Sequence, residues 1–179
     1  MIRTDPGRDP AATGAQAVLL SMGTDLEPLT QLESALVLRA GPASRSRLQA
    51  LEDLPIGGAV VLPGTELALE LIIHVVIRSL EVGVSEASLE RAFLHGLQRA
   101  ADWGVETLAV PPLGVGAGNL EAEASARAML GALRRHRLES LLPRTLVILG
   151  VDAYQEGVFQ RAARAFDPKV TSPETSGGA

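Results

Sequence analysis

Three glycines at alternate positions mark the stretch of this sequence that is best suited to binding a ligand. The segment VPPLGVGAGNL, residues 110–120, places Gly114, Gly116 and Gly118 between a short apolar run and an alanine-rich helical pattern. Glycine lets backbone N–H groups turn toward an anion and lets a phosphate approach without a Cβ in the way. A chain that needs positive φ only to turn uses the same residues. Glycine spacing leaves both interpretations open, and the segment is neither a Walker A loop nor a GxGxxG fingerprint, because residue 119 is Asn.

The three histidines are not spaced for metal binding. His74 lies inside the apolar run LIIHVVI and is predicted to be a core histidine satisfied by backbone groups. His95 and His136 fall on helical patterns without companion ligands. We therefore predict no metal site and no cofactor.

Acidic and aromatic residues near the glycines have two interpretations each. Glu121 and Glu123 follow the glycines and are expected in the first turn of a helix, where its dipole favours carboxylates. Asp152 and Tyr154 follow the last apolar run. They line the same cleft as the glycines or, as such residues more often do, cap and turn the chain.

The composition indicates a single folded domain in the cytoplasm. The chain has 179 residues, 46% of them apolar and 21% charged. Its net charge of −5 argues against binding to nucleic acid or to an anionic membrane, but not against binding one small anion. The absence of cysteine excludes disulfides and thiolate metal sites. No apolar run is long enough to span a membrane, and the opening residues lack the apolar core of a signal peptide.

Short apolar runs alternate with helical patterns along the chain. The runs at 17–22, 59–63, 71–77, 107–112 and 145–151 are typical of strands buried on both faces. Helical patterns cover 29–41, 85–104, 120–137 and 154–166. The runs at 59–63 and 71–77 are close enough to pair as a hairpin, so we predict a three-layer α/β fold with a mixed sheet. We expect residues 1–8 to be a flexible loop, 9–167 to be the domain, and 168–179 to be a disordered tail.

Two stretches resemble the macro domain, the ADP-ribose-binding family. GGAVVLPGTELALELIIHVVI (57–77) is similar to the family's strand pair without a gap, and TLAVPPLGVGAGNL (107–120) is similar to its second phosphate loop. The resemblance extends over residues 9–166. It implies an α/β/α fold in which the diphosphate is held by Leu113, Gly114, Val115, Gly116, Ala117, Gly118 and Asn119.

The earlier part of the chain departs from the family pattern. Leu20 to Gly23 occupy the positions of the family's Asn-Ala-Ala-Asn motif, and Leu29, Thr30 and Gln31 replace three glycines of its first phosphate loop. In hydrolytic relatives the asparagine at the Gly23 position orients the distal ribose or the attacking water, which glycine does not do. The resemblance thus implies an altered or closed first loop around Gly23, Thr24 and Thr30.

The resemblance also gives expectations for the adenine side. Asp9 falls at the distance of the family's adenine-reading Asp. Asp152 and Tyr154 are the further candidates there, with Tyr154 as a substitute for the aromatic residue that stacks near the adenine.

Three functional hypotheses follow from the resemblance. The first is a noncatalytic module that binds ADP-ribose or a related nucleotide diphosphate. The second is an ADP-ribosyl hydrolase, in which Thr24, Asp25 or Thr30 would have to position the water. The third is a degenerate macro fold with a structural or assembly role. The family's usual opening strands are missing from the N-terminus as we interpret it, so a sheet edge is expected to be available for a homodimer.

Overall fold

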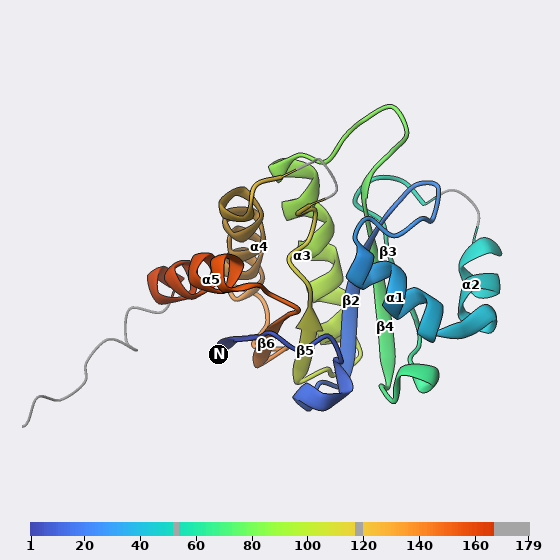
Figure 1. Ribbon diagram of the computed structural model, residues 1–179, viewed down its shortest axis with the longest axis horizontal. Coiled ribbons are helices and arrows are strands. Elements are labelled where there is room, and N and C mark those ends of the chain that lie inside the picture. Colours follow the sequence, from blue (N-terminus) through green and yellow to red (C-terminus); the bar gives the residue numbers. More distant parts are fainter. Residues whose placement is uncertain (52–53, 117–119, 167–179) are drawn as a thin grey trace, which may run out of the picture.

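A mixed six-stranded sheet forms the centre of the computed structural model, which describes residues 1–51, 54–116 and 120–166. The strand order is β1-β6-β5-β2-β4-β3, and only the β3–β4 pair is antiparallel (Figure 1). The strands are β1 (Ile2–Asp5), β2 (Ala17–Gly23), β3 (Ala59–Pro63), β4 (Leu71–Arg78), β5 (Thr107–Val110) and β6 (Thr145–Leu149). The predicted α/β fold, the mixed sheet and the hairpin are confirmed.

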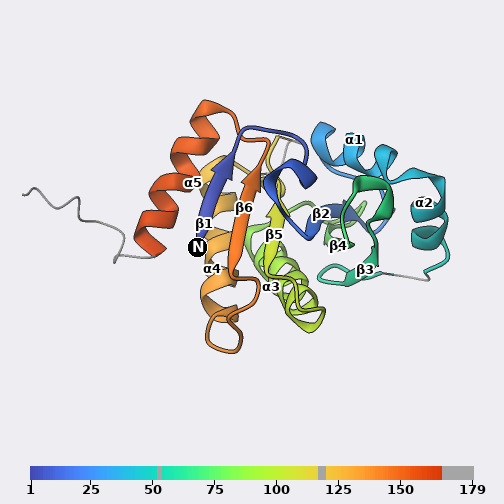
Figure 2. The same ribbon diagram turned by 90° about the horizontal axis from the view of Figure 1, so that it is seen from below.

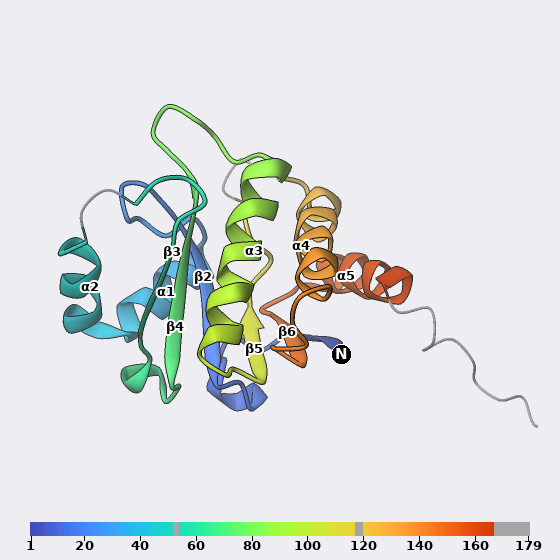
Figure 3. The same ribbon diagram turned by 180° about the vertical axis from the view of Figure 1, so that it is seen from behind.

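Helices cover both faces of the sheet. They are α1 (Gln31–Arg39), α2 (Gly41–Gln49), α3 (Glu86–Asp102), α4 (Ala122–His136) and α5 (Ala153–Phe166), with short 3-10 turns at Ala11–Thr13 and Thr65–Leu67. Helices α1 and α2 lie on one side, and α3 and α4 lie on the other, as the views from front and back show (Figures 1 and 3). Helix α5 packs against α4 and β1 (Figure 2).

The apolar runs are unalternated because each strand side chain meets a helix layer on its own face. In β2, Ala17 and Leu19 belong to the core under α3 and α4, whereas Val18 and Leu20 belong to the core under α1. All four are fully buried. Helix α3 approaches the sheet closely at Gly96, where an added Cβ would lie 2.4 Å from Leu19 Cδ1.

Two parts of the predicted organisation are wrong. Ile2–Asp5 is not a flexible loop but an edge strand that pairs in parallel with β6. The chain therefore does have an opening strand. Residues 41–49 form helix α2, which was not predicted, and Gly41 with φ of +81° joins it to α1. The predicted boundaries of the domain stay a prediction, and the predicted tail, 168–179, lies outside the described residues.

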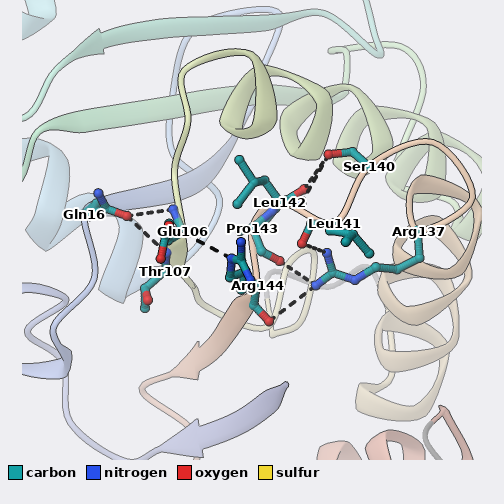
Figure 4. A network of polar contacts seen from close by, with 9 residues as sticks. All are labelled: Gln16, Glu106, Thr107, Arg137, Ser140, Leu141, Leu142, Pro143 and Arg144. Atoms are coloured by element: carbon teal, nitrogen blue, oxygen red, sulfur yellow. Dashed lines mark hydrogen bonds and ion pairs between the residues drawn. The ribbon is translucent and has the colours of Figure 1, made fainter.

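Side chains fix the turns at the amino ends of the strands (Figure 4). Gln16 Oε1 accepts a hydrogen bond from the N–H of Glu106, at 2.6 Å, where the chain enters β5. The guanidinium of Arg137 donates to the carbonyls of Leu141, Pro143 and Arg144 in the turn before β6. Burial lowers the pKa of Arg137. The hydrogen bonds from Arg137 thus hold the turn before β6 in place.

No helix within the described residues has both the length and the apolar character needed to cross a bilayer. The same residues hold no group of three or more His, Asp or Glu side chains placed to bind a metal ion.

Candidate functional site

The candidate site lies where the parallel strands end, at the edge from which loops lead into helices. We call residues 24–30, between β2 and α1, the first loop, and residues 111–121, between β5 and α4, the second loop. In an open α/β sheet, ligands bind at this edge. The two loops differ in backbone conformation and in the hydrogen bonds that their backbone groups make.

The second loop has the backbone geometry that the glycine pattern predicted. Leu113 is buried, and its carbonyl accepts a hydrogen bond of 2.7 Å from Ser125 Oγ in α4, which anchors the loop. Gly114 and Gly116 have φ of +70° and +87°. A Cβ on Gly116 would meet no atom within 4 Å, so the chain turns there and also leaves open space beside the backbone. Ala117, Gly118 and Asn119 lie outside the described residues.

A cavity of about 530 Å³ lies beside this loop. Its lining comes from the second loop and from the starts of α4 and α5, and consists of Val115, Gly116, Leu120, Glu121, Ala122, Tyr154 and Gln155. Tyr154 is 58% exposed, and its hydroxyl donates a hydrogen bond of 2.6 Å to Glu123 Oε1 in α4. That bond raises the pKa of Tyr154 and lowers the pKa of Glu123. The hydrogen bond to Glu123 thus holds the ring of Tyr154 in place and engages its hydroxyl group.

The other two predicted adenine-side residues make local contacts. Asp152 Oδ1 accepts a hydrogen bond of 2.8 Å from the N–H of Gln155, which caps the start of α5. Asp9 forms an exposed ion pair of 3.4 Å with Arg39 of α1 and accepts from the N–H of Ala11. Neither residue lines the cavity at the second loop.

The position of the family asparagine is filled by an ion pair. An added Cβ on Gly23 would lie 2.2 Å from Asp25 Oδ1 and 3.4 Å from the guanidinium carbon of Arg78. Asp25 and Arg78 pair at 3.4 Å across this space. Thr24 is held by a 3.0 Å hydrogen bond from its N–H to the carbonyl of Arg78. A larger side chain at Gly23 would have to displace the carboxylate of Asp25.

Thr30 is the N-cap of α1. Its hydroxyl accepts from the N–H of Glu33 at 3.1 Å, and Glu33 Oε2 accepts from the N–H of Thr30 at 3.1 Å. This reciprocal pair is a capping box, and the sequence pattern Thr-x-x-Glu at the start of a helix is the signal that indicates it.

Glu33 was not predicted as a site residue. Its carboxyl group is fully buried and accepts from the N–H of Ser21 at 2.7 Å, the hydroxyl of Ser21 at 2.6 Å and the N–H of Leu29 at 3.3 Å, besides Thr30. Burial raises the pKa of Glu33, and the hydrogen bonds from Ser21, Thr30 and Leu29 oppose that effect. This buried acid of α1, which accepts four hydrogen bonds, ties the end of the first loop to α1 and to β2.

The histidines lie away from both loops. His74 is buried in β4 as predicted, but the prediction that backbone groups satisfy it is wrong for Nε2, which has no hydrogen-bond partner among the described residues. Burial lowers the pKa of His74 to about 4. His95 Nδ1 contacts the carbonyl of Gly57 at 2.6 Å, and His136 Nε2 contacts that of Leu142 at 2.6 Å.

Comparison with solved structures places this fold among macro domains. The macro domain of ganglioside-induced differentiation-associated protein 2 matches with a TM-score of 0.77 at 19% identity, covering 95% of this chain and 86% of that one. A Trypanosoma brucei macrodomain solved in complex with ADP-ribose matches with a TM-score of 0.75 at 15% identity, covering 90% of this chain and 68% of that one.

Comparison of the sequence with known proteins identifies the family to which the chain belongs. An uncharacterized protein of Mycobacterium tuberculosis is 32% identical over 110 residues, which is 60% of this chain but only 30% of that relative. The matched stretch therefore spans less than a third of the length of that relative. The model of the macro domain family matches residues 24–129, from the first loop through the second loop into α4. The match covers more than half of the sequence, and the chain belongs to the macro domain family.

Proposed function

We propose that this chain binds ADP-ribose or a related nucleotide diphosphate and does not hydrolyse it. The observation that carries the proposal is the backbone at Gly116, which has φ of +87° and open space beside it at the mouth of a cavity. Membership of the macro domain family supports the same ligand class. Trypanosoma brucei macrodomains of the same fold were solved in complex with ADP and with ADP-ribose.

Each part of the second-loop site has a role in this proposal. Backbone N–H groups of the loop, residues 113–119, donate to phosphate oxygens, which are stronger acceptors than neutral groups. The fixed ring of Tyr154 stacks on the base. Glu121 lines the cavity and accepts hydrogen bonds from ribose hydroxyl groups. Asp9 stays the predicted acceptor for the adenine amino group, in competition with Arg39.

The first loop supports binding without turnover. Gly23 has no side chain with which to position a water molecule, and the carboxylate of Asp25 beside it is paired with Arg78. Thr30, another candidate for that task, uses its hydroxyl to cap α1. General base catalysis needs a free acceptor within hydrogen-bond reach of the water. We therefore propose a module that binds and does not hydrolyse.

Calorimetry with ADP-ribose tests the proposal, with Gly116 and Gly104 as a matched pair of mutation sites. Both glycines have positive φ, +87° and +70°, and both have open space where a Cβ would lie. Alanine therefore brings similar backbone strain at either position, but only Gly116 lines the cavity. Gly116→Ala is expected to weaken ADP-ribose binding by at least about tenfold, and Gly116→Glu to abolish it by placing a carboxylate against phosphate.

Gly104→Ala should leave the affinity unchanged. Wild-type affinity in Gly116→Glu would exclude the second loop from the site. Release of ADP-ribose from a modified protein by the wild type would instead support the hydrolase hypothesis.

Three further points stay proposals. We propose that the chain acts in the cytoplasm, on the basis of a cysteine-free sequence. We propose that it does not bind nucleic acid, on the basis of its net charge of −5. The sheet edges at β1 and β3 give a homodimer two surfaces on which to form.

A further inference from the structure

A cavity of about 500 Å³ lies between helix α3 and the segment that leads into β3, and we call it the α3 cavity (Figure 3). It shares no lining residue with the cavity at the second loop. One wall is the segment 55–59. The other wall is one side of α3, which contributes Arg91, His95, Gln98 and Arg99.

Three of these side chains are basic and recur at every fourth position of α3. Positions four apart share a helix face and are about 6 Å apart along the axis, so Arg91, His95 and Arg99 form one row. All three residues are exposed. Neither Arg91 nor His95 forms an ion pair within the described residues.

The acidic residues of α3 do not neutralise this row. Glu86 and Glu90 pair with Arg127 and Arg135 of α4, at 2.7 and 3.2 Å, on the side of α3 that faces that helix. Asp102 pairs with Arg99 at 3.4 Å, but both side chains are at least half exposed, and such a pair contributes little. The described lining of the α3 cavity includes no acidic residue. A chain with a net charge of −5 thus concentrates basic groups at one cavity.

Backbone carbonyls of the opposite wall orient two of the basic side chains. Arg91 Nη2 donates to the carbonyl of Ile56 at 3.0 Å. His95 Nδ1 lies 2.6 Å from the carbonyl oxygen of Gly57, and because a carbonyl only accepts, Nδ1 carries the proton. Gly57 has φ of +92°, and an added Cβ there would lie 2.7 Å from Arg91 Nε. The wall therefore holds Arg91 and His95 by one nitrogen each and leaves other nitrogens of both side chains for a ligand.

We infer that the α3 cavity binds a phosphate group, either free in solution or carried by a phosphorylated side chain. A guanidinium group presents several N–H donors in a plane and forks onto pairs of phosphate oxygens. Arg91 and Arg99 supply two such groups, and His95 between them adds Nε2. A phosphate monoester carries a charge of about −1.5 to −2 and three acceptor oxygens, which suits three basic side chains better than one carboxylate does. The inference does not rest on the proposed function.

An NMR titration with sodium phosphate tests the inference, with sodium chloride at equal ionic strength as the reference. Phosphate should shift the amide signals of Gly57 and Gly58 and the ring signals of His95, and the shifts should saturate. Arg91→Gln and Arg99→Gln should each weaken phosphate binding by at least about fivefold, because each removes a charged donor. Arg99 makes no hydrogen bond to the segment 55–59 within the described residues, so its variant tests the charge without loosening that wall.

Arg135→Gln is the matched control. It removes an exposed guanidinium from the neighbouring helix, where Arg135 pairs with Glu90, and it should leave phosphate affinity unchanged. Equal weakening in this variant would show that only the overall charge matters, which overturns the inference. Shifts that do not saturate at tens of millimolar phosphate, or tighter binding of succinate than of phosphate, would overturn it too.

A phosphoserine peptide and its unphosphorylated form distinguish the two sources of the phosphate group. Tighter binding of the phosphopeptide than of inorganic phosphate supports a site for phosphorylated protein, and equal affinity supports a site for free phosphate. Failure of the phosphopeptide and of inorganic phosphate to bind overturns the inference. Because the α3 cavity and the second loop share no residue, that failure would leave the proposed function in place.

Discussion

Acid should destabilise this protein through one buried imidazole. His74 lies in β4 with Ile72 and Val76 as its neighbours on the same face of the sheet, and both are buried apolar residues. Its Nε2 has no hydrogen-bond partner within the described part of the chain. Burial therefore disfavours the imidazolium and lowers the pKa of His74 from 6.5 to about 4.

The size of the effect follows from the difference between the pKa of His74 in the unfolded chain and its pKa in the folded chain. Between pH 6.5 and 4 the unfolded chain binds a proton at His74 that the folded chain does not bind, so the stability that the neutral imidazole preserves is lost as the pH falls. The difference is about 2.5 pH units, and each unit corresponds to about 1.4 kcal/mol. The free energy of unfolding should therefore fall by about 3 kcal/mol between pH 7 and pH 4 on account of His74 alone.

Urea unfolding of the wild type and of His74→Leu at several pH values isolates this contribution. Subtracting the two curves cancels the other titrating groups, including Glu33, whose raised pKa acts in the opposite direction. The variant should gain about 3 kcal/mol relative to the wild type as the pH falls from 7 to 4. Val75→Ala, in the same strand but in the core on the other face, is the control: it should lose stability without changing the pH slope. A constant difference between the wild type and His74→Leu across this range would refute the argument.

Two further predictions concern packing and the first loop. Glu33→Ala should lower the free energy of unfolding by about 3 kcal/mol or more, because it leaves the N–H groups of Ser21, Leu29 and Thr30 without an acceptor. Sodium formate should restore part of the lost melting temperature of that variant, and an equal effect of sodium chloride would argue against an anion site. Gly96→Ala should destabilise by about 1–3 kcal/mol, because its Cβ would lie 2.4 Å from Leu19 Cδ1. Gly131→Ala, in α4 with its nearest contact at 3.6 Å, should be neutral or stabilise by up to about 1 kcal/mol. Equal urea midpoints for the two glycine variants would contradict the packing argument.

Five strands were predictable because their apolar side chains leave a strong local signal. LIIHVVI at 71–77 lies within β4, where residues 72–77 are all buried, since a strand covered on both faces is apolar at nearly every position. Strand β1 gives no such signal. Its sequence IRTD has one apolar residue, and it is a strand because β6 offers hydrogen-bonding partners beside it. Helix α2 was missed because GPASRSRLQ buries only Ser44 and Leu48 and begins with Gly-Pro.

The candidate site was predictable only in its local parts. The positive φ of Gly114 and Gly116 follows from residue type, because glycine adopts that conformation readily. The closing of the first loop depends on Glu33 reaching Ser21, twelve positions earlier, on a different element. The capping pattern predicts the contact of Glu33 with Thr30, but it does not indicate which strand lies behind the helix. Contacts between distant elements need the assembled fold.

The place of β1 at the edge of the sheet has a consequence for synthesis on the ribosome. Within the described residues its one strand partner is β6, and the ammonium group of Met1 donates to the carbonyl of Arg144, 143 positions further along the chain. Among the six strands described, β1 is therefore synthesised first and pairs only after β6, the last of the six. Strand β2 pairs earlier, because β4 follows it within the first half of the chain. The segment that forms β1 thus stays unpaired until β6 has been synthesised, and chaperones that bind extended segments have that interval in which to act.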